Sequence, residues 1–294
     1  SLDGLFIDMA NLISKVKPDS KDKVFINLLK THPIWVHFSK RMKDKKLQDR
    51  SIKIRELINQ FLNDNKTYNV KFSKEGNTFI CGGFKFELPA FRIKVLEKKG
   101  SLEEIITMIL RYQCIVARGN HWNIPLKFYK YIYEKEGVRI EGFSSPLNSQ
   151  LMLLGDDVQF CSLFPDTDKV FGSIGSFFNL DNPEAVSVNP PYTEKLINEC
   201  IIKSLEWKNT RLYYNVPLWT DMIGYDMLDK VAEKKVYNSG EYYYEHMGDK
   251  IMFKGRHLMY TLRAKNSKAV FDTLKPSAAM LKEFNAKGRL INTK

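Results

Sequence analysis

The sequence predicts an α/β protein in which an open, mostly parallel sheet follows an amino-terminal domain that is mainly helical. Apolar residues recur at helical spacing through most of the first hundred residues, and from Val138 onward short apolar runs alternate with helical segments. Strands that are joined by helices pair mostly in parallel, with right-handed crossovers. At 294 residues, the chain can form one large domain or two ordinary ones.

The elements are expected in a definite order along the chain. Helical patterns occupy most of residues 5–62, and alternation on either side of Glu75-Gly76-Asn77 predicts a β-hairpin. Further helices are expected at about 90–98, 101–117, 125–135 and 193–207. Strands are expected at 138–143, 160–164, 185–188 and 211–217, with two or three more around Gly248 and Gly255.

Charge is segregated along the chain. Residues 1–100 carry 21 Lys and Arg against 11 Asp and Glu, residues 101–253 carry 15 against 21, and residues 254–294 carry 10 against 2. Basic ends therefore flank an acidic middle, within a net charge of +12. Such segregation indicates polyanion binding if the basic segments converge, and solvated helix faces with a basic tail are the alternative.

Composition excludes several classes of protein. No run of 18 apolar residues occurs, so no membrane span is expected. The start, Ser-Leu-Asp without Met, suggests that the amino end has been trimmed, and no signal-peptide pattern is present. The four cysteines form no C-x-x-C pair and the five histidines no i, i+4 pair, so no metal site is expected. Free buried thiols favour an intracellular, reducing compartment.

Asn189-Pro190-Pro191-Tyr192 follows the strand predicted at 185–188. Proline cannot donate to a strand ladder, so the strand should stop at the carboxyl edge of the sheet, where open α/β sheets bind ligands. The Asn189 side-chain oxygen and the rigidly held Pro190 carbonyl can accept both N–H groups of an exocyclic adenine amine. The Tyr192 ring can stack on the base, for roughly 1–3 kcal/mol. An ordinary strand-ending turn is the alternative.

The methyl donor that suits this chemistry is S-adenosylmethionine, because transfer from a sulfonium requires alignment more than a strong general base. The loop Phe143-Ser144-Ser145-Pro146-Leu147-Asn148 follows the first strand of the α/β part and is the expected cofactor loop. Asp166 and Asp168 follow the second strand, where an acidic residue commonly accepts from ribose hydroxyls. For either aspartate, an Asx turn is the alternative.

FSSPLN at 143–148, FCSLFPDTDKVFGS at 160–173 and VNPPY at 188–192 together resemble the catalytic core of a known family. It is the cap-specific adenosine N6-methyltransferase family, to which the phosphorylated-CTD-interacting factor belongs. The stretch YYNVPLW at 213–219 resembles its next core strand, and the resemblance covers about residues 108–265.

The resemblance implies a Rossmann-like, S-adenosylmethionine-dependent methyltransferase that acts on N6 of the adenosine beside the 7-methylguanosine cap of mRNA. It implies that Asn189, Pro190, Pro191 and Tyr192 are the catalytic motif, with Tyr192 also against the substrate. It places four residues around the cofactor: Phe143, Ser145, Asn148 and Asp166. Tyr192 stands where animal members typically have Phe. No WW module is recognised in the chain, so tethering to a phosphorylated polymerase tail is not expected.

The expected organisation has three parts. A helical domain with a β-hairpin at 1–112 is expected to contact RNA, a Rossmann-like methyltransferase domain occupies 113–278, and a basic tail occupies 279–294. Aromatic residues can stack on the cationic cap base. The candidates are Trp35, Trp122, Trp207, Trp219 and Tyr242 to Tyr244, and for each of them core packing is the alternative, so no cap pocket is assigned.

Two alternatives stay open at the level of sequence. The first is a DNA adenine N6-methyltransferase, because its chemistry at residues 189–192 would be identical. The second is a nucleic-acid-binding module with a vestigial methyltransferase fold, against which the intact tetrapeptide argues.

Overall fold

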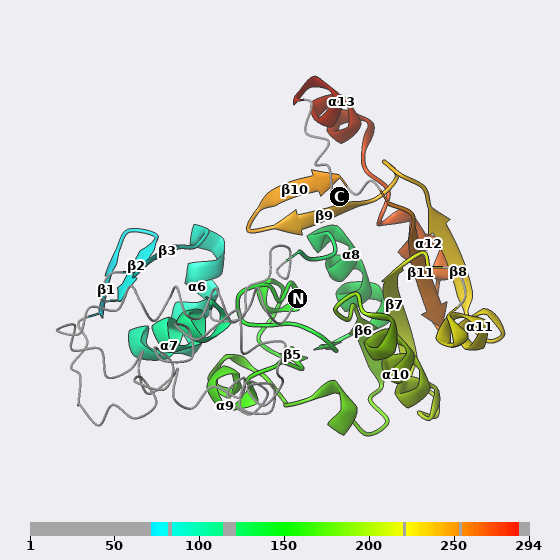
Figure 1. Ribbon diagram of the computed structural model, residues 1–294, viewed down its shortest axis with the longest axis horizontal. Coiled ribbons are helices and arrows are strands. Elements are labelled where there is room, and N and C mark those ends of the chain that lie inside the picture. Colours follow the sequence, from blue (N-terminus) through cyan, green and yellow to red (C-terminus); the bar gives the residue numbers. More distant parts are fainter. Residues whose placement is uncertain (1–71, 82–83, 114–121, 220–221, 253–254, 288–294) are drawn as a thin grey trace, which may run out of the picture. The chain divides into compact units, whose positions relative to one another are not determined.

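The computed structural model describes residues 72–81, 84–113, 122–219, 222–252 and 255–287 (Figure 1). The chain divides into two compact units, Ser1–Asn120 and His121–Lys294. The helical patterns expected within residues 5–62 lie outside the described residues.

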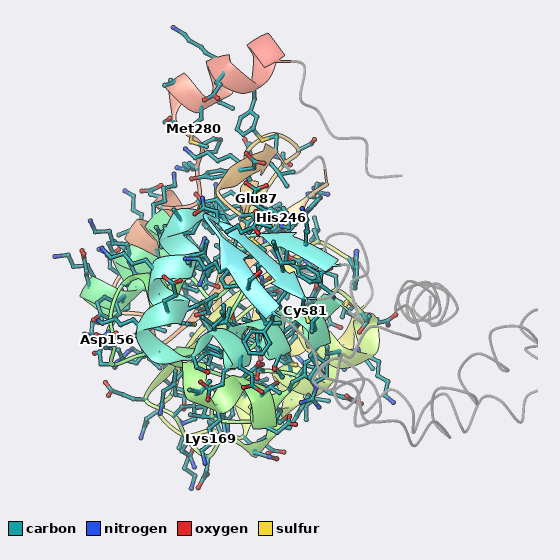
Figure 2. The ribbon with its side chains drawn as sticks, turned by 90° about the vertical axis from the view of Figure 1, so that its left-hand side faces the viewer. Cys81, Glu87, Asp156, Lys169, His246 and Met280 are labelled. Carbon is teal, nitrogen blue, oxygen red and sulfur yellow. The ribbon has the colours of Figure 1, made fainter. Side chains whose placement is uncertain are left out.

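The first unit contains a small antiparallel sheet followed by two helices. The strands pair in the order β1 (Phe72–Glu75), β2 (Thr78–Cys81) and β3 (Phe84–Glu87). Figure 2 labels Cys81 and Glu87, which end β2 and β3. The predicted hairpin is confirmed, because β1 and β2 pair around Gly76, whose φ of +57° suits glycine. The helices are α6 (Ala90–Lys99) and α7 (Leu102–Gln113).

The second unit is built on a six-stranded mixed sheet. In spatial order its strands are β5 (Gln159–Phe160), β4 (Ile140–Glu141), β6 (Ala185–Val188), β7 (Arg211–Pro217), β11 (His257–Leu262) and β8 (Glu233–Tyr237). The first four strands pair in parallel, and β11 pairs antiparallel with both β7 and β8. The predicted α/β class is therefore confirmed, whereas strand β8 and the antiparallel insertion of β11 between β7 and β8 were not predicted.

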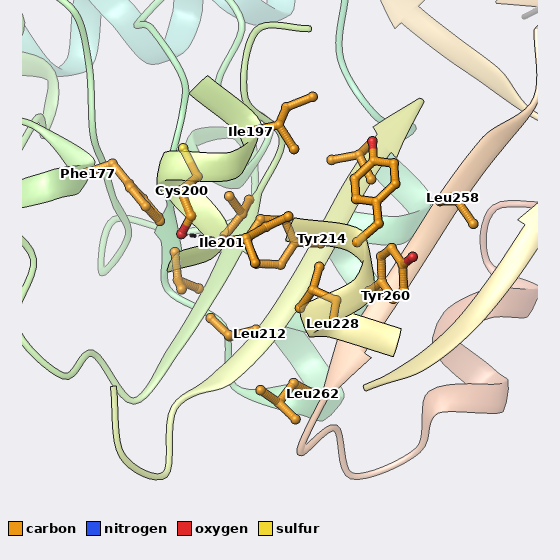
Figure 3. Close-up of a cluster of buried hydrophobic side chains, with 14 of the residues drawn as sticks. Phe177, Ile197, Cys200, Ile201, Leu212, Tyr214, Leu228, Leu258, Tyr260 and Leu262 are labelled. Carbon is orange, nitrogen blue, oxygen red and sulfur yellow. Dashed lines mark hydrogen bonds between the residues drawn. The ribbon is translucent and has the colours of Figure 1, made fainter. Parts of the chain in front are cut away.

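One face of this sheet is apolar. Alternation along the strands directs Val186, Val188 and Tyr214 to a single face. They form a buried cluster with residues of α10 (Glu194–Leu205) and α11 (Ile223–Asp229), which Figure 3 shows.

The opposite face of the sheet is polar although it is buried. Ser187, Asn215 and His257 lie on it, each at most 2% exposed. The Tyr213 hydroxyl donates to Glu136 of η1 (Ile132–Glu136), and the Tyr237 hydroxyl donates to a carbonyl of α12 (Ser267–Asp272). Helical segments therefore cover both faces of the sheet.

Local sequence explains the strand and helix that flank the tetrapeptide. β6 consists of four buried residues and ends at Val188, directly before Asn189-Pro190, as predicted. Helix α10 then begins at Glu194, whose charge suits the positive end of a helix dipole. Its buried residues, Ile197, Cys200, Ile201 and Ser204, have the spacing of one helical face.

β4 and β5 are shorter than the predicted strands at 138–143 and 160–164. The chain leaves β4 at Gly142, where an added Cβ would lie 2.8 Å from the Phe177 ring and 3.2 Å from the Ser187 carbonyl oxygen. On the side away from β4, the backbone of Phe160 and Ser162 bonds to the segment 172–175.

The described part of the second unit contains eight further elements. They are α8 (Leu126–Tyr131), η2 (Leu151–Leu153), α9 (Pro165–Asp168), η3 (Lys169–Phe171), η4 (Phe177–Asn179), β9 (Tyr243–His246), β10 (Asp249–Met252) and α13 (Ala278–Lys287). β9 and β10 form an antiparallel hairpin, drawn in orange in Figure 1. The segment expected as a basic tail, 279–294, is helical through Lys287. Within the described residues, no helix has the length and apolar character needed to cross a membrane.

Candidate functional site

The two loops that the sequence predicts as a site meet at one edge of the sheet. β4 and β6 are parallel neighbours, so residues 143–148 and 189–192 both follow carboxyl strand ends at this edge. The Gly142 N–H donates to the Ser187 carbonyl at 2.7 Å, which extends the pairing to the start of the first loop. The Ser144 N–H donates to the Cys161 carbonyl at 2.9 Å, which ties that loop to the end of β5.

The tetrapeptide forms a turn of mixed exposure. Asn189 is partly buried, Pro190 is buried and Pro191 is exposed, while the Tyr192 ring packs in part against the apolar core. The Thr193 N–H donates to the Pro191 carbonyl at 2.8 Å, which directs the chain into α10.

Three aromatic side chains connect to Asn189 by hydrogen bonds. The Tyr192 hydroxyl donates to Asn189 Oδ1 at 3.2 Å and lies 2.5 Å from the Tyr244 hydroxyl. The Tyr244 hydroxyl lies 3.2 Å from His257 Nδ1. Burial raises the pKa of both hydroxyls and lowers the pKa of His257 to about 3, so all three groups are uncharged at neutral pH.

The expected cofactor loop is held in shape by Asn148. Its Oδ1 accepts from the Ser144 hydroxyl at 3.1 Å and from both the N–H and the hydroxyl of Ser145 at 2.8 Å. The Asn148 carbonyl accepts from the Asn123 side chain. Ser145 is buried, and the Phe143 ring lies 4.9 Å from the Phe177 ring, centroid to centroid. This hydrogen bonding gives the loop a defined shape without a glycine-rich sequence.

A buried carboxylate anchors the far end of the same loop. Glu141 on β4 is 1% exposed and accepts from the Ser149 hydroxyl, from Gln150 N–H at 3.2 Å and from Leu151 N–H at 3.3 Å. Because strand and loop are joined in this way, the position of the loop depends on Glu141.

The two aspartates after β5 differ in their surroundings. Asp166 is exposed on α9, whereas Asp168 is fully buried, and its main chain bonds to Phe164 and Ser173. Asp166 is therefore the one whose side chain faces solvent beyond the carboxyl end of β5.

The candidate aromatic residues fall into two groups. The Trp219 ring, 37% exposed, follows β7 and lies edge-on to Tyr192 at 6.5 Å, and the Trp122 ring lies 5.8 Å from Tyr244. Trp207 is buried in the apolar core beside Phe177, so it cannot stack on a ligand. Trp35 lies outside the described residues.

The basic residues that flank β11 lie at opposite edges of the sheet. The Arg256 carbonyl accepts from Leu218 N–H just past the carboxyl end of β7, the edge that carries Asn189. Arg263 donates to the Thr210 carbonyl at 3.0 Å, which precedes β7, so Arg263 lies at the edge opposite to the one that carries Asn189. Further basic residues of the two basic segments lie outside the described residues, among them Lys43, Lys45, Lys46, Arg50 and Lys254.

No local pattern in the sequence predicts a role for Glu141 or His257, and the sequence predicts Tyr244 only as a candidate for stacking. The signal for Glu141 is a charged residue inside an apolar strand, since such a group is buried only with partners. Tyr244 and His257 lie far from Asn189 along the chain and are linked to it only by side-chain hydrogen bonds through Tyr192, so no local pattern marks that contact.

Comparison with known proteins places this site in context. The family model described as phosphorylated CTD interacting factor 1 WW domain matches residues 93–247, more than half of the chain. Although that description names a WW domain, the matched span contains both loops of the site and most of the mixed sheet.

Two curated relatives are similar to part of the chain. Both are named mRNA (2'-O-methyladenosine-N(6)-)-methyltransferase: one from Mus musculus, 29% identical over 107 residues, and one from Homo sapiens, 30% identical over 109 residues. Each comparison covers 34% of this chain, which spans 14% of the length of these relatives. By the extent of the family match, the chain belongs to the phosphorylated CTD interacting factor 1 WW domain family.

Proposed function

We propose that the chain is an S-adenosylmethionine-dependent methyltransferase that acts on N6 of the adenosine beside the 7-methylguanosine cap of mRNA. The observation that carries the proposal is the position of Asn189-Pro190-Pro191-Tyr192 at the carboxyl end of β6, next to the loop 143–148. The names of the two relatives support mRNA as the substrate. The parallel order β5-β4-β6-β7, with helical segments on both faces, supports a Rossmann-like sheet.

The residues at this edge suit the proposed cofactor. The Phe177 ring and the Ser187 carbonyl lie so close to Gly142 that a side chain there would not fit. The loop 143–148 therefore begins at a position where only the backbone is present. Phe143, Ser145 and Asn148 offer an apolar face together with hydroxyl and amide groups, and the exposed Asp166 carboxylate could accept from a ribose diol. S-adenosylmethionine, when bound, supplies a sulfonium methyl group for transfer.

The tetrapeptide would orient the amine that receives the methyl group. Asn189 Oδ1 and the Pro190 carbonyl accept its two N–H groups, which draws the nitrogen toward tetrahedral geometry and directs its lone pair outward. The Tyr192 ring holds the base by stacking. These residues would hold the amine in line for the methyl group that the cofactor supplies, and the amine would release one proton to solvent on transfer.

The direct test is methyl transfer from labelled S-adenosylmethionine to four substrates: capped RNA with adenosine first, the same RNA with a 2′-O-methyl group on that adenosine, uncapped RNA and single-stranded DNA. We expect N6-methyladenosine after nucleoside digestion from capped RNA, and from neither uncapped RNA nor DNA. Label in DNA would favour the DNA methyltransferase instead. Cofactor binding without transfer to any substrate would favour a vestigial fold.

RNA binding should depend on the basic side chain at the correct edge of the sheet. Arg256→Gln is expected to raise the KM for RNA and to reduce the salt dependence of binding by about 0.7 in log–log slope, the value for one phosphate contact on a single strand. Arg263→Gln is the matched control, because both arginines are exposed and flank β11 at its two ends. Equal slopes for the two variants would show that Arg256 contacts no phosphate.

A further inference from the structure

The hydrogen bonds behind Asn189 form a continuous series that the proposed chemistry does not require. It runs from Asn189 Oδ1 through the hydroxyls of Tyr192 and Tyr244 to His257 Nδ1, at 3.2, 2.5 and 3.2 Å. The groups come from three elements: the turn after β6, strand β9 and the first residue of β11. Tyr244 is 2% exposed and His257 is fully buried, so both are shielded from solvent.

The direction of every bond in the series follows from its first member. A carboxamide oxygen cannot donate, so the Tyr192 hydroxyl donates its only hydrogen to Asn189 Oδ1. Tyr244 must therefore donate to Tyr192, and its oxygen is left to accept from His257. This requires the neutral histidine with its hydrogen on Nδ1.

The surroundings of His257 favour that neutral form. Burial lowers the pKa of His257 to about 3. Its ring stacks on the Tyr242 ring at a centroid distance of 4.1 Å and an angle of 22°, which fixes the plane of the imidazole. His257, the donor at the end of the series, is therefore kept neutral by burial and kept in one orientation by stacking.

We propose that Tyr244 and His257 are positioning residues that orient the Asn189 carboxamide through the Tyr192 hydroxyl. The inference rests on the proposed function. A hydroxyl that donates to Oδ1 holds the oxygen, rather than the amino group, on that side of the amide. The same oxygen has a second lone pair, which can accept an N–H of the substrate amine. Without the series, the Asn189 carboxamide could rotate and turn its NH₂ group toward the substrate amine. Both groups are donors, so no hydrogen bond could form between them.

The test compares Tyr244→Phe, Tyr192→Phe and the double variant in the methyl-transfer assay with capped RNA. Each single change keeps the ring and is expected to lower kcat about 3- to 10-fold, the effect of one hydrogen bond, with unchanged cofactor Kd. The double variant should be no slower than Tyr192→Phe alone, because the series is already broken at Tyr192. If Tyr244 had a merely structural role, Tyr244→Phe would lower kcat by the same factor in the Tyr192→Phe background as in the wild-type protein.

His257 is tested with a conservative pair. His257→Asn can keep a donor near the position of Nδ1, whereas His257→Leu removes it, so Asn should retain more of kcat than Leu. Tyr214→Phe is the control for loss of a buried hydroxyl, since Tyr214 bonds to Ser204 and Cys200 on the opposite face of the sheet. It should lower the melting temperature and leave kcat unchanged.

The outcomes separate the two proposals. If the wild-type protein methylates RNA but Tyr244→Phe keeps wild-type kcat, or lowers it as much in the Tyr192→Phe background as alone, the positioning role is wrong and the proposed function stands. If the wild-type protein transfers no methyl group to any substrate, both are overturned. Any loss of kcat that is accompanied by weaker cofactor binding in Tyr244→Phe also contradicts the positioning role.

Discussion

Asn189→Ala is expected to lower the rate of methyl transfer by about 10²–10³-fold, by analogy with the loss of one preorganised polar partner in other enzymes. The substitution removes the acceptor that would hold the reacting amine. It changes little core volume, because Asn189 is only partly buried. The fold and the cofactor Kd should therefore remain close to wild type, as measured by thermal melting and calorimetric titration.

Asn198→Ala provides the matched control for this substitution. Asn198 lies on α10 and accepts from the Gly224 N–H at 2.9 Å, on the apolar face of the sheet. It should cost some stability but no activity. A correctly folded Asn189→Ala protein with near-normal turnover would remove Asn189 from the proposed mechanism.

Glu141→Ala is expected to weaken binding of S-adenosylmethionine by about 10- to 100-fold. The carboxylate accepts three hydrogen bonds that tie residues 149–151 to β4. Loss of one hydrogen bond to a charged group costs about 1.5–3 kcal/mol, and each 1.4 kcal/mol is about tenfold in affinity. Glu141→Gln keeps one acceptor and the side-chain shape, so its Kd should fall between those of wild type and Glu141→Ala.

A second buried carboxylate separates an effect on the loop from an effect on stability. Glu136 is fully buried and also accepts three hydrogen bonds, from the Tyr213 hydroxyl and from the N–H groups of Lys265 and Asn266. Lys265 and Asn266 follow β11, at the edge of the sheet away from the site. Glu136→Gln should lower the melting temperature without changing the cofactor Kd of the folded protein. Wild-type affinity in Glu141→Ala would show that the anchored loop does not hold the cofactor.

Local sequence was sufficient to predict the elements that carry their own signals. β6 was predictable because four small or apolar residues are followed by two prolines, and α10 because its buried residues recur at helical spacing. The length of β4 was overestimated. The strand ends where Gly142 contacts the Phe177 ring, and this contact joins distant parts of the chain. A local pattern contains no information about such a contact.

The candidate site shows the same division. The tetrapeptide and the loop 143–148 were predictable from their positions after expected strands. The residues behind them were not, because Tyr244 and His257 become neighbours of Tyr192 only through tertiary structure. Charge segregation along the chain likewise did not reveal that Arg256 and Arg263 lie at opposite edges, which depends on the direction of β11.

The antiparallel direction of β11 also has a consequence for how the protein is made. β11 lies between β7 and β8 and delivers His257 to the edge that carries Asn189. During translation, the tetrapeptide leaves the ribosome before residues 257–262 have been synthesised. In that interval β7 has no strand paired on the side that β11 later occupies. Long-range pairing of this kind slows folding and leaves strand edges exposed in the interval. The hydrogen-bond series behind Asn189 is therefore completed only in the late step in which β11 pairs with β7 and β8.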